Sequence, residues 1–247
     1  MKVGIIGCGS IGSAVASSLE NSVVFDVDYR RALEVAERCN AIAVKSFEEL
    51  MEQNPEVVLE AASQEAVRMY AEKVVERADM VVMSAGAFAD LELFHRVAEA
   101  ARKNSRYLVI PSGAIAGVDA IKAVAEHIEE VVLTTRKNPR SLGIEVDGER
   151  VIFEGGVLEA VSLYPKNINV ASVLGIAAGF EKVKVRIIAD PTVSENVHRI
   201  TAKGEFGELR IEVRNRPMPE NPKTSYLAAL SAVKALKDLR ERVVVGT

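Results

Sequence analysis

Apolar runs alternate with amphipathic segments through the first 110 residues. The runs have the length of buried strands, and the segments between them have the spacing of helices. The expected strands are residues 2–6, 22–28, 56–62, 79–85 and 106–112. The clearest expected helices are residues 30–39, 64–78 and 91–103. Continuous apolar strands separated by amphipathic helices predict a parallel sheet that is covered on both faces, as in a Rossmann-type doubly wound α/β fold.

One predicted helix carries its apolar residues at a regular spacing. Leu91, Phe94, Ala98 and Ala101 recur three or four positions apart in the segment LELFHRVAEAARK. That spacing places them on one side of a helix. We therefore expect these four side chains to form its buried face.

The pattern changes after residue 112, where polar and apolar residues alternate one by one. Residues 183–187 and 208–214 predict strands with one solvated face, and residues 142–153 predict a hairpin that turns at Asp147-Gly148. These features predict a second α+β domain built on a mainly antiparallel sheet.

A proline-rich connector at residues 216–222 precedes the last helix. Asn221 is the expected N-cap, with Pro222 in the first helical position. The helix is expected to turn one apolar side inward, made of Tyr226, Leu230, Val233 and Leu236. The predicted domains are residues 1–112 for dinucleotide binding, 113–220 for substrate binding and dimerisation, and a C-terminal helix in 221–247 that packs back on the first domain.

A glycine-rich loop follows the first predicted strand in the segment GIIGCGSIGSA. Gly7 permits a tight turn, Gly9 lets the backbone approach a pyrophosphate, and Gly12 lets the helix pack against the sheet. The helix start at Ser10 and Ile11 presents backbone N–H groups to phosphates. We therefore expect these five residues to bind a dinucleotide; the alternative is a tight turn that binds nothing.

The choice between NAD and NADP depends on the end of the second predicted strand. Asp26 lies 19 residues after Gly7, where a carboxylate accepts hydrogen bonds from a ribose diol and repels a 2′-phosphate. Asp28 is the competing acid, and Arg30 and Arg31 are able to pair with a 2′-phosphate. The sequence therefore favours NAD and leaves NADP open.

Composition excludes several classes of protein. The chain has 247 residues and a formal net charge of −4, with a pI near 5.6, so nothing indicates a nucleic-acid or anionic-membrane partner. Its apolar runs are shorter than the roughly 20 residues that span a bilayer. Two cysteines, Cys8 and Cys39, do not make a disulfide framework, and the spacing of metal-binding motifs is absent. A strand begins almost at once, without the pattern of a secretory signal, so we expect a cytoplasmic protein without a metal.

The chain resembles the L-aspartate dehydrogenases in segments that run through most of its length. The segments are GCGSIG, SAGAFAD, IPSGAIAGVDA, FEGGVLEAVSLYPKNINVAS, KVKVRIIADPTVSENVHRI and ENPKTSYLAAL. The resemblance implies NAD(P)-dependent oxidation of L-aspartate to iminoaspartate, which feeds NAD synthesis, by a homodimer. It implies that His198 is the active-site residue. It also implies that Ala114 and Asn169 contact the nicotinamide, with Asn167 as the alternative to Asn169.

Oxidation of an amino acid requires a group that accepts a proton near neutral pH, and histidine is the natural choice. His95 and His127 lie in helical patterns, whereas His198 follows a strand-like run and the break at Asp190-Pro191. We expect His198 to act as a base or as a donor that orients a carboxylate, with Asp190 a candidate to orient its ring.

A dicarboxylic substrate also requires cations or oriented N–H groups. The candidates are Arg136, Lys137, Lys166, Arg199 and Lys223. The alternative functions are a related two-domain reductase of the dihydrodipicolinate reductase or homoserine dehydrogenase type, and a dinucleotide sensor without catalysis.

Overall fold

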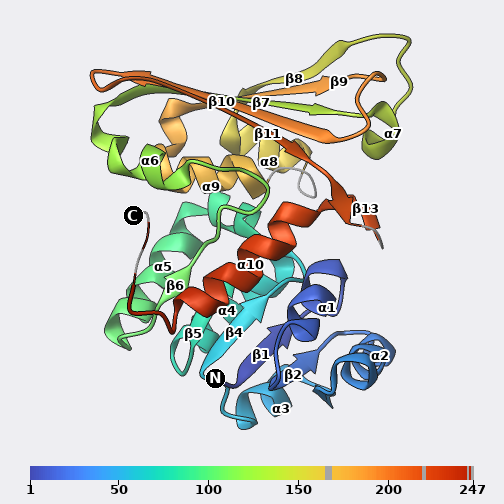
Figure 1. The fold of residues 1–247 in the computed structure, drawn as a ribbon. Helices are drawn as coiled ribbons and strands as arrows, with labels where there is room; N and C mark the ends of the chain where they lie inside the picture. The colour runs from blue at the N-terminus through green and yellow to red at the C-terminus, as the bar shows by residue number, and fades with distance from the viewer. Residues whose placement is uncertain (165–168, 219–220, 244, 246–247) are drawn as a thin grey trace. The chain divides into compact units, whose positions relative to one another are not determined.

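A computed structural model describes residues 1–164, 169–218, 221–243 and 245, with the side chains of 222 and 223 left undescribed (Figure 1). The chain divides into two compact units. Unit 1 contains Met1–Pro111 and Ala229–Arg242, and unit 2 contains Ser112–Ala228. Each unit is built on its own sheet. None of the helices in the described part of the chain is long and apolar enough to cross a membrane.

Unit 1 contains a six-stranded parallel sheet in the order β3-β2-β1-β4-β5-β6. This order, with strands on both sides of β1, is the Rossmann arrangement that the sequence predicts. The strands are short and largely buried because helices cover both faces. Their bounds are β1 Val3–Ile6, β2 Ser22–Phe25, β3 Ile42–Val44, β4 Val57–Glu60, β5 Asp79–Val82 and β6 Leu108–Val109.

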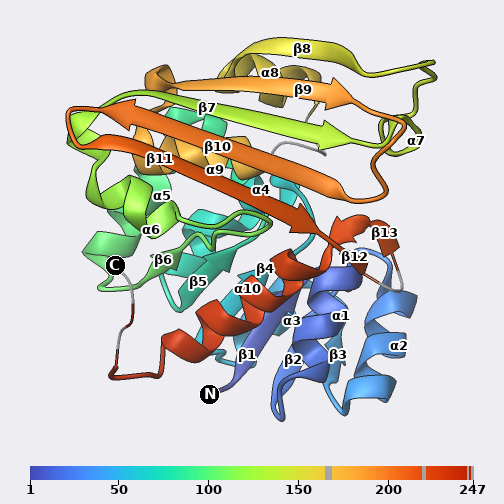
Figure 2. The same cartoon turned by 45° about the horizontal axis from the view of Figure 1, so that its top comes forward.

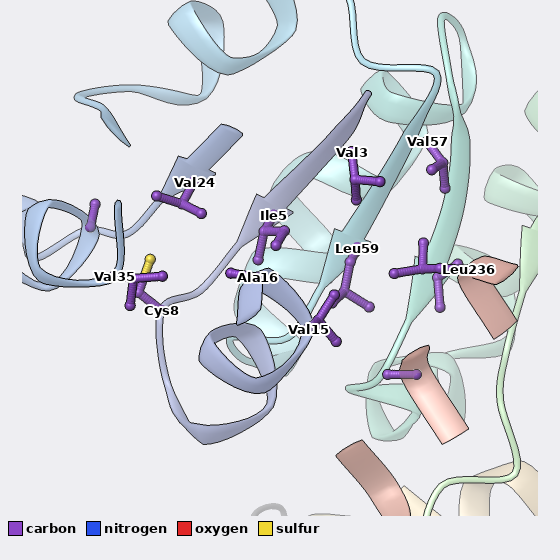
Figure 3. Close-up of a cluster of buried hydrophobic side chains, with 13 residues drawn as sticks. Val3, Ile5, Cys8, Val15, Ala16, Val24, Val35, Val57, Leu59 and Leu236 are labelled. Carbon is purple, nitrogen blue, oxygen red and sulfur yellow. The ribbon is translucent and has the colours of Figure 1, made fainter. Parts of the chain in front are cut away.

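The helices of unit 1 lie on both faces of this sheet (Figures 1 and 2). They are α1 Ser10–Ser17, α2 Tyr29–Cys39, α3 Phe47–Glu52, α4 Gln64–Val75, the 3₁₀ turn η1 Ala85–Ala89 and α5 Leu91–Lys103. The last helix of the chain, α10 (Tyr226–Asp238), contributes Ala232 and Leu236 to the core of this unit. Figure 3 shows that core, where Ile5 and Leu59 of the sheet lie near Val15 and Ala16 of α1.

Two elements of unit 1 were missed by the sequence pattern, and one face was assigned wrongly. The short pair β3 and α3 follows α2, and its three-residue strand is too brief to show a period. In α5 the buried side chains are Leu93, Val97 and Ala101, whereas Leu91 is exposed. The predicted face of α5 is therefore wrong at its start. The helix carries two adjacent apolar rows, and it is the row through Leu93 and Val97 that is buried.

Unit 2 contains a five-stranded sheet in the order β11-β10-β7-β9-β8. Three of its four pairings are antiparallel and the β7–β9 pairing is parallel, so the prediction of a mainly antiparallel sheet is confirmed. The bounds are β7 Ile128–Lys137, β8 Arg150–Gly156, β9 Val183–Ala189, β10 Asn196–Gly204 and β11 Gly207–Asn215.

The helices α6, α8 and α9 lie on one face of this sheet (Figures 1 and 2). The helical elements of unit 2 are α6 Val118–Ala123, η2 Ala125–His127, α7 Pro139–Leu142, α8 Val157–Leu163, α9 Asn169–Ala178 and η3 Phe180–Lys182. On β9, Val183, Val185 and Ile187 are buried while Lys184 and Arg186 are exposed. The strand therefore has the one wet face that its alternation predicts.

The predicted hairpin at residues 142–153 is wrong. Residues 144–149 form no strand, and β8 pairs with β9 instead. A turn sequence such as Asp147-Gly148 is a local preference, and the distant strand β9 supplies the hydrogen-bonding partner that decides where β8 lies.

The predicted start of the last helix is also wrong. Residues Asn221–Ser225 form the strand β13, which pairs with β12 (Pro217–Met218), and α10 begins at Tyr226. Its buried residues are Ala229, Ala232 and Leu236, whereas Tyr226 and Leu230 are exposed. The small alanine side chains allow a close approach to the neighbouring core, so they, and not the larger Tyr226 and Leu230, form the buried side.

Candidate active site

The glycine loop joins β1 to α1 in unit 1, and each of its three glycines has a different structural role. Gly7 has a positive φ of 99°, and its N–H donates to the Phe25 carbonyl at 2.8 Å. A Cβ on Gly12 would lie 1.9 Å from the Gly7 carbonyl oxygen, so this position holds the helix against the loop. A Cβ on Gly9 would meet nothing within 4 Å. Gly9 therefore leaves an open approach at the start of α1, where the N–H groups of Ser10 and Ile11 lie.

A hollow of about 330 Å³, named here the loop hollow, opens beside this turn. Its volume lies in the range of small-molecule sites. Three of the predicted cofactor residues line it, namely Gly7, Gly9 and Asp26, whereas Ser10, Ile11 and Gly12 do not. The remaining lining comes from the ends of β1 and β2, from the loop after β4, and from α2 and α4, and includes Val27, Arg31, Ala62, Ser63, Met69 and Tyr70.

Asp26 is buried directly after β2, and both of its carboxylate oxygens accept backbone hydrogen bonds. Oδ2 accepts from the Cys8 N–H at 2.8 Å, and Oδ1 accepts from the Asp28 N–H at 2.9 Å. A carboxylate has about four lone-pair positions, so two hydrogen bonds leave it able to accept from a ribose diol. The same contacts hold the glycine loop in place, since Cys8 lies inside that loop.

Asp28 and the two arginines are engaged with one another at the start of α2. Asp28 is the N-cap, and its carboxylate lies 3.2 Å from Arg30 Nε and 3.9 Å from Arg31 Nε. The hydrogen bond from Arg30 lowers the pKa of Asp28 below its ordinary value. Asp28 therefore has a structural partner, while Arg31 also lines the loop hollow.

Glu60, at the end of β4, is a buried carboxylate that sequence reasoning missed. Oε1 accepts from the N–H groups of Ala62 and Ser63 at 2.8 and 2.9 Å, and Oε2 accepts from the Ser84 N–H at 3.0 Å. Burial raises the pKa of Glu60, although these hydrogen bonds oppose the rise. The residue joins the loops that follow β4 and β5. An acid at the end of an otherwise apolar strand was the signal for it.

His198 lies near the start of β10 in unit 2 and is buried. Its Nδ1 lies 3.0 Å from Thr135 Oγ1 on β7, the residue directly opposite in the strand register. His198, Ile200 and Ala202 are all buried, and Arg199 between the first two is exposed. His198 therefore lies on the inner face of the sheet, in β10, the strand that follows β9 and the break at Asp190-Pro191. Thr135 was not a candidate from the sequence.

Lys137 lies two positions beyond Thr135 on β7 and on the same side of that strand, and it is also buried. Burial lowers its pKa to about 8. Burial, and after it the positive charge of Lys137, lower the pKa of His198 to about 3. The imidazole is therefore neutral at pH 7, so one of its ring nitrogens carries a proton and the other a lone pair.

Asp190 does not orient the His198 ring in the way the sequence suggested. Its carboxylate accepts from Thr192 Oγ1 at 2.6 Å and from Arg136 at 2.7 Å. The Thr192 hydroxyl, and after it Arg136, lower the pKa of Asp190. Arg136 also pairs with Glu149. The described hydrogen-bond partner of the imidazole is Thr135 instead.

The other predicted site residues of unit 2 are placed as follows. Ala114 lies in the loop before α6, and its carbonyl accepts from Asn215 Nδ2 at 2.9 Å. Asn215 is itself buried and accepts a hydrogen bond from Ser225 through Oδ1. Asn169 is the first residue of α9. Asn167 and Lys166 lie outside the described residues, as does the side chain of Lys223.

The two remaining histidines and the remaining arginine candidate, Arg199, lie on the surface. His95 is exposed on α5, and His127 is exposed beside Glu205. Arg199 is exposed and pairs with Glu212. Among the described residues, no group of three or more His, Cys, Asp or Glu side chains is arranged to hold a metal ion. The chemistry of the described part thus gathers in two places, around the loop hollow in unit 1 and around His198 in unit 2.

Comparison with known proteins gives consistent matches along the chain. Residues 119–239 match the family model described as aspartate dehydrogenase, C-terminal, and residues 7–111 match the NAD binding domain of homoserine dehydrogenase. The L-aspartate dehydrogenase of Archaeoglobus fulgidus is 49% identical and is aligned over 99% of this chain and 100% of its own. The corresponding protein of Methanosarcina barkeri is 44% identical, with full coverage of both chains.

A solved structure agrees with these matches. The crystal structure of aspartate dehydrogenase from Thermotoga maritima superposes with a TM-score of 0.87 at 31% identity, and covers 100% of this chain and 99% of its own. The matches span both units and extend nearly end to end. The chain belongs to the L-aspartate dehydrogenase family.

Proposed function

We propose that this protein is an NAD(P)-dependent dehydrogenase that oxidises L-aspartate to iminoaspartate, and that also runs in reverse from oxaloacetate plus ammonia. The full-length identity of 49% to the L-aspartate dehydrogenase of Archaeoglobus fulgidus carries the proposal. The loop hollow and the buried histidine supply the two kinds of site that this reaction needs.

The residues of unit 1 fit a dinucleotide. The open side of Gly9 admits a pyrophosphate, and the start of α1 presents backbone N–H groups to it. We assign Gly7, Gly9, Ser10, Ile11 and Gly12 to this task, and we assign the nicotinamide contacts to Ala114 and Asn169 on the ground of family resemblance. The bound cofactor would accept a hydride from the substrate.

We infer that NAD is preferred to NADP. Asp26 keeps two lone-pair positions for a ribose diol after its bonds to Cys8 and Asp28. Its negative charge disfavours a phosphate at the same place. Arg30 and Arg31, the cations able to attract that phosphate, form ion pairs with Asp28.

The reaction removes a proton from the substrate ammonium and a hydride from its Cα. We assign His198 to the proton or to orienting the substrate, because its imidazole is neutral and its Nδ1 is held by Thr135. A substrate carboxylate near the ring favours its protonated form and raises its pKa. The unprotonated ring nitrogen is then suited to accept a proton as the carbon–nitrogen double bond forms.

Enzyme assays test the function directly. Purified protein is incubated with NAD or NADP and a panel of amino acids that includes L-aspartate and L-homoserine, and reduction is followed by nicotinamide absorbance. We expect turnover with L-aspartate and, in reverse, with oxaloacetate plus ammonia. Turnover with L-homoserine instead would favour the homoserine dehydrogenase type that the match of residues 7–111 leaves as the second candidate. Cofactor binding without any turnover would indicate a sensor.

A second assay tests the role of His198. We expect His198→Ala to lower turnover by roughly 10²–10⁴-fold while NAD affinity stays near that of the wild type. An unchanged turnover number for the folded variant would make His198 a structural residue. Homodimer formation and a part in NAD biosynthesis stay predictions from the family resemblance, and a cytoplasmic location stays a prediction from the composition of the chain.

A further inference from the structure

Lys137 carries a buried ammonium, an unusual feature among the described residues of unit 2. Lys137 ends β7 and is only 7% exposed, although lysine is one of the residues least often buried. Placing an ammonium in a protein interior has a substantial desolvation cost. The lowered pKa of Lys137 reflects that cost. A position that keeps such a residue next to the candidate catalytic group requires a functional explanation.

The strand register brings Lys137 to His198. Thr135 is opposite His198, and Lys137 follows it on the same side of β7. His198 is 4% exposed, so each of the two side chains keeps a small accessible fraction. The charge of Lys137 also reaches the imidazole and lowers its pKa. The cation and the proton-handling group therefore act in one small region of unit 2.

The other two candidate cations with described side chains form ion pairs with carboxylates of the protein. Arg136 is bonded to Asp190 and Glu149. Arg199 is exposed and bonded to Glu212. Of the candidate cations whose side chains the structure describes, Lys137 is the one that shares the inner face with His198.

We propose that Lys137 binds a carboxylate of the substrate beside His198 and so selects an acidic amino acid. This inference rests on the proposed function, because it takes L-aspartate as the substrate. A carboxylate on the ammonium neutralises the charge that disfavours imidazolium formation. Lys137 would thus recognise the substrate and, through the same contact, make His198 a better proton acceptor only when the substrate is bound.

The test compares Lys137→Met with the matched variant Lys184→Met. Methionine keeps the length and volume of lysine without its charge, and replacing a buried charge by an apolar group of similar size is often tolerated. Lys184 lies on the neighbouring strand β9, is exposed and pairs with Glu130 on the surface. Steady-state kinetics with L-aspartate, NAD affinity and inhibition by succinate are measured for both variants. Lys137→Gln is the second variant, for the case in which the methionine variant does not fold.

We expect Lys137→Met to lower kcat/KM for L-aspartate by roughly 10²–10³-fold, mainly through KM, because a buried charged partner is lost. Succinate, a dicarboxylate without an amino group, should lose its inhibition in parallel, while NAD affinity stays within about twofold and Lys184→Met behaves as the wild type.

Wild-type KM and wild-type succinate inhibition in the folded Lys137 variants would overturn the proposal, even if kcat fell. Absence of L-aspartate turnover in the wild-type protein is a different result, since it would overturn the proposed function itself.

Discussion

Thr135 Oγ1 lies 3.0 Å from His198 Nδ1 across two neighbouring strands, so a hydroxyl from β7 sets the position of the ring on β10. If the Nδ1–H donates to Thr135, the free lone pair is on Nε2, where a base needs it. The register of β7 against β10 thus places the hydroxyl that decides which ring nitrogen of His198 carries the proton.

Thr135→Val removes this hydrogen bond while keeping the shape of the side chain. We expect kcat with L-aspartate to fall by roughly tenfold, which corresponds to one hydrogen bond of about 1–1.5 kcal/mol. NAD affinity should not change. Thr135→Ser keeps the hydroxyl and is the control. Equal kcat for the valine variant and the wild type would show that the ring is held by other contacts.

Stability should depend on pH through His198. Its pKa in the folded protein is about 3, against an ordinary value of 6.5. Above pH 6.5 the ring is neutral in both states. Between pH 6.5 and 3 only the unfolded chain binds the proton, so the free energy of unfolding falls as the pH falls, by up to about 1.4 kcal/mol per pH unit.

Urea unfolding of the wild type and of His198→Gln at pH 7, 5.5 and 4.5 measures this contribution. We expect the stability of the glutamine variant to decline less steeply with acid. His127→Gln replaces an exposed histidine and serves as the control. Parallel curves for the wild type and His198→Gln would contradict the neutral, buried state of the imidazole.

Two substitutions in the glycine loop should have different effects, one on stability and the other on NAD affinity. In Gly12→Ala the new Cβ would lie 1.9 Å from the Gly7 carbonyl oxygen. We expect a loss of about 1–3 kcal/mol in the free energy of unfolding from this overpacking.

In Gly9→Ala the new Cβ meets no protein atom within 4 Å. Its stability should therefore equal that of the wild type, while NAD affinity falls on the order of tenfold because the methyl group occupies the approach of the pyrophosphate. Thermal melting and NAD titration of the two variants check the separation. Normal NAD binding by Gly9→Ala would place the pyrophosphate elsewhere.

Asp26→Ala tests the cofactor preference. The variant loses the acceptor for the buried Cys8 N–H, so we expect it to be less stable by about 1–3 kcal/mol. It should also bind NAD at least roughly tenfold more weakly, because the ribose diol loses its acceptor. NADP should be affected much less.

Asp28→Ala is the matched control, since it removes the cap of α2, at a cost of about 1 kcal/mol, without touching Asp26. Equal weakening of NAD and NADP by Asp26→Ala would argue against ribose recognition by this carboxylate.

Most of the fold of unit 1, including its glycine loop, could be predicted from the sequence. Gly7, Gly9 and Gly12 have their roles through local backbone geometry, and local geometry follows from short spacings. The alternation of β9 likewise predicted which side chains are buried. Periodicity failed at β3, which has three residues, and on α5 and α10, where more than one apolar row was available and contact with the rest of the core selected one.

Residue types and spacing on their own predicted that this chain would form a glycine loop, a parallel sheet and a second sheet, and they left His198 as the histidine outside the helical patterns. The family resemblance then made it the active-site candidate. The sequence pattern did not predict which side chains lie next to that histidine. Thr135 is 63 positions away, and Lys137 is one of several basic residues until strand register places it on the same side of β7. Pairing between distant strands decides which side chains meet, because each strand's own pattern fixes its faces but not its neighbours.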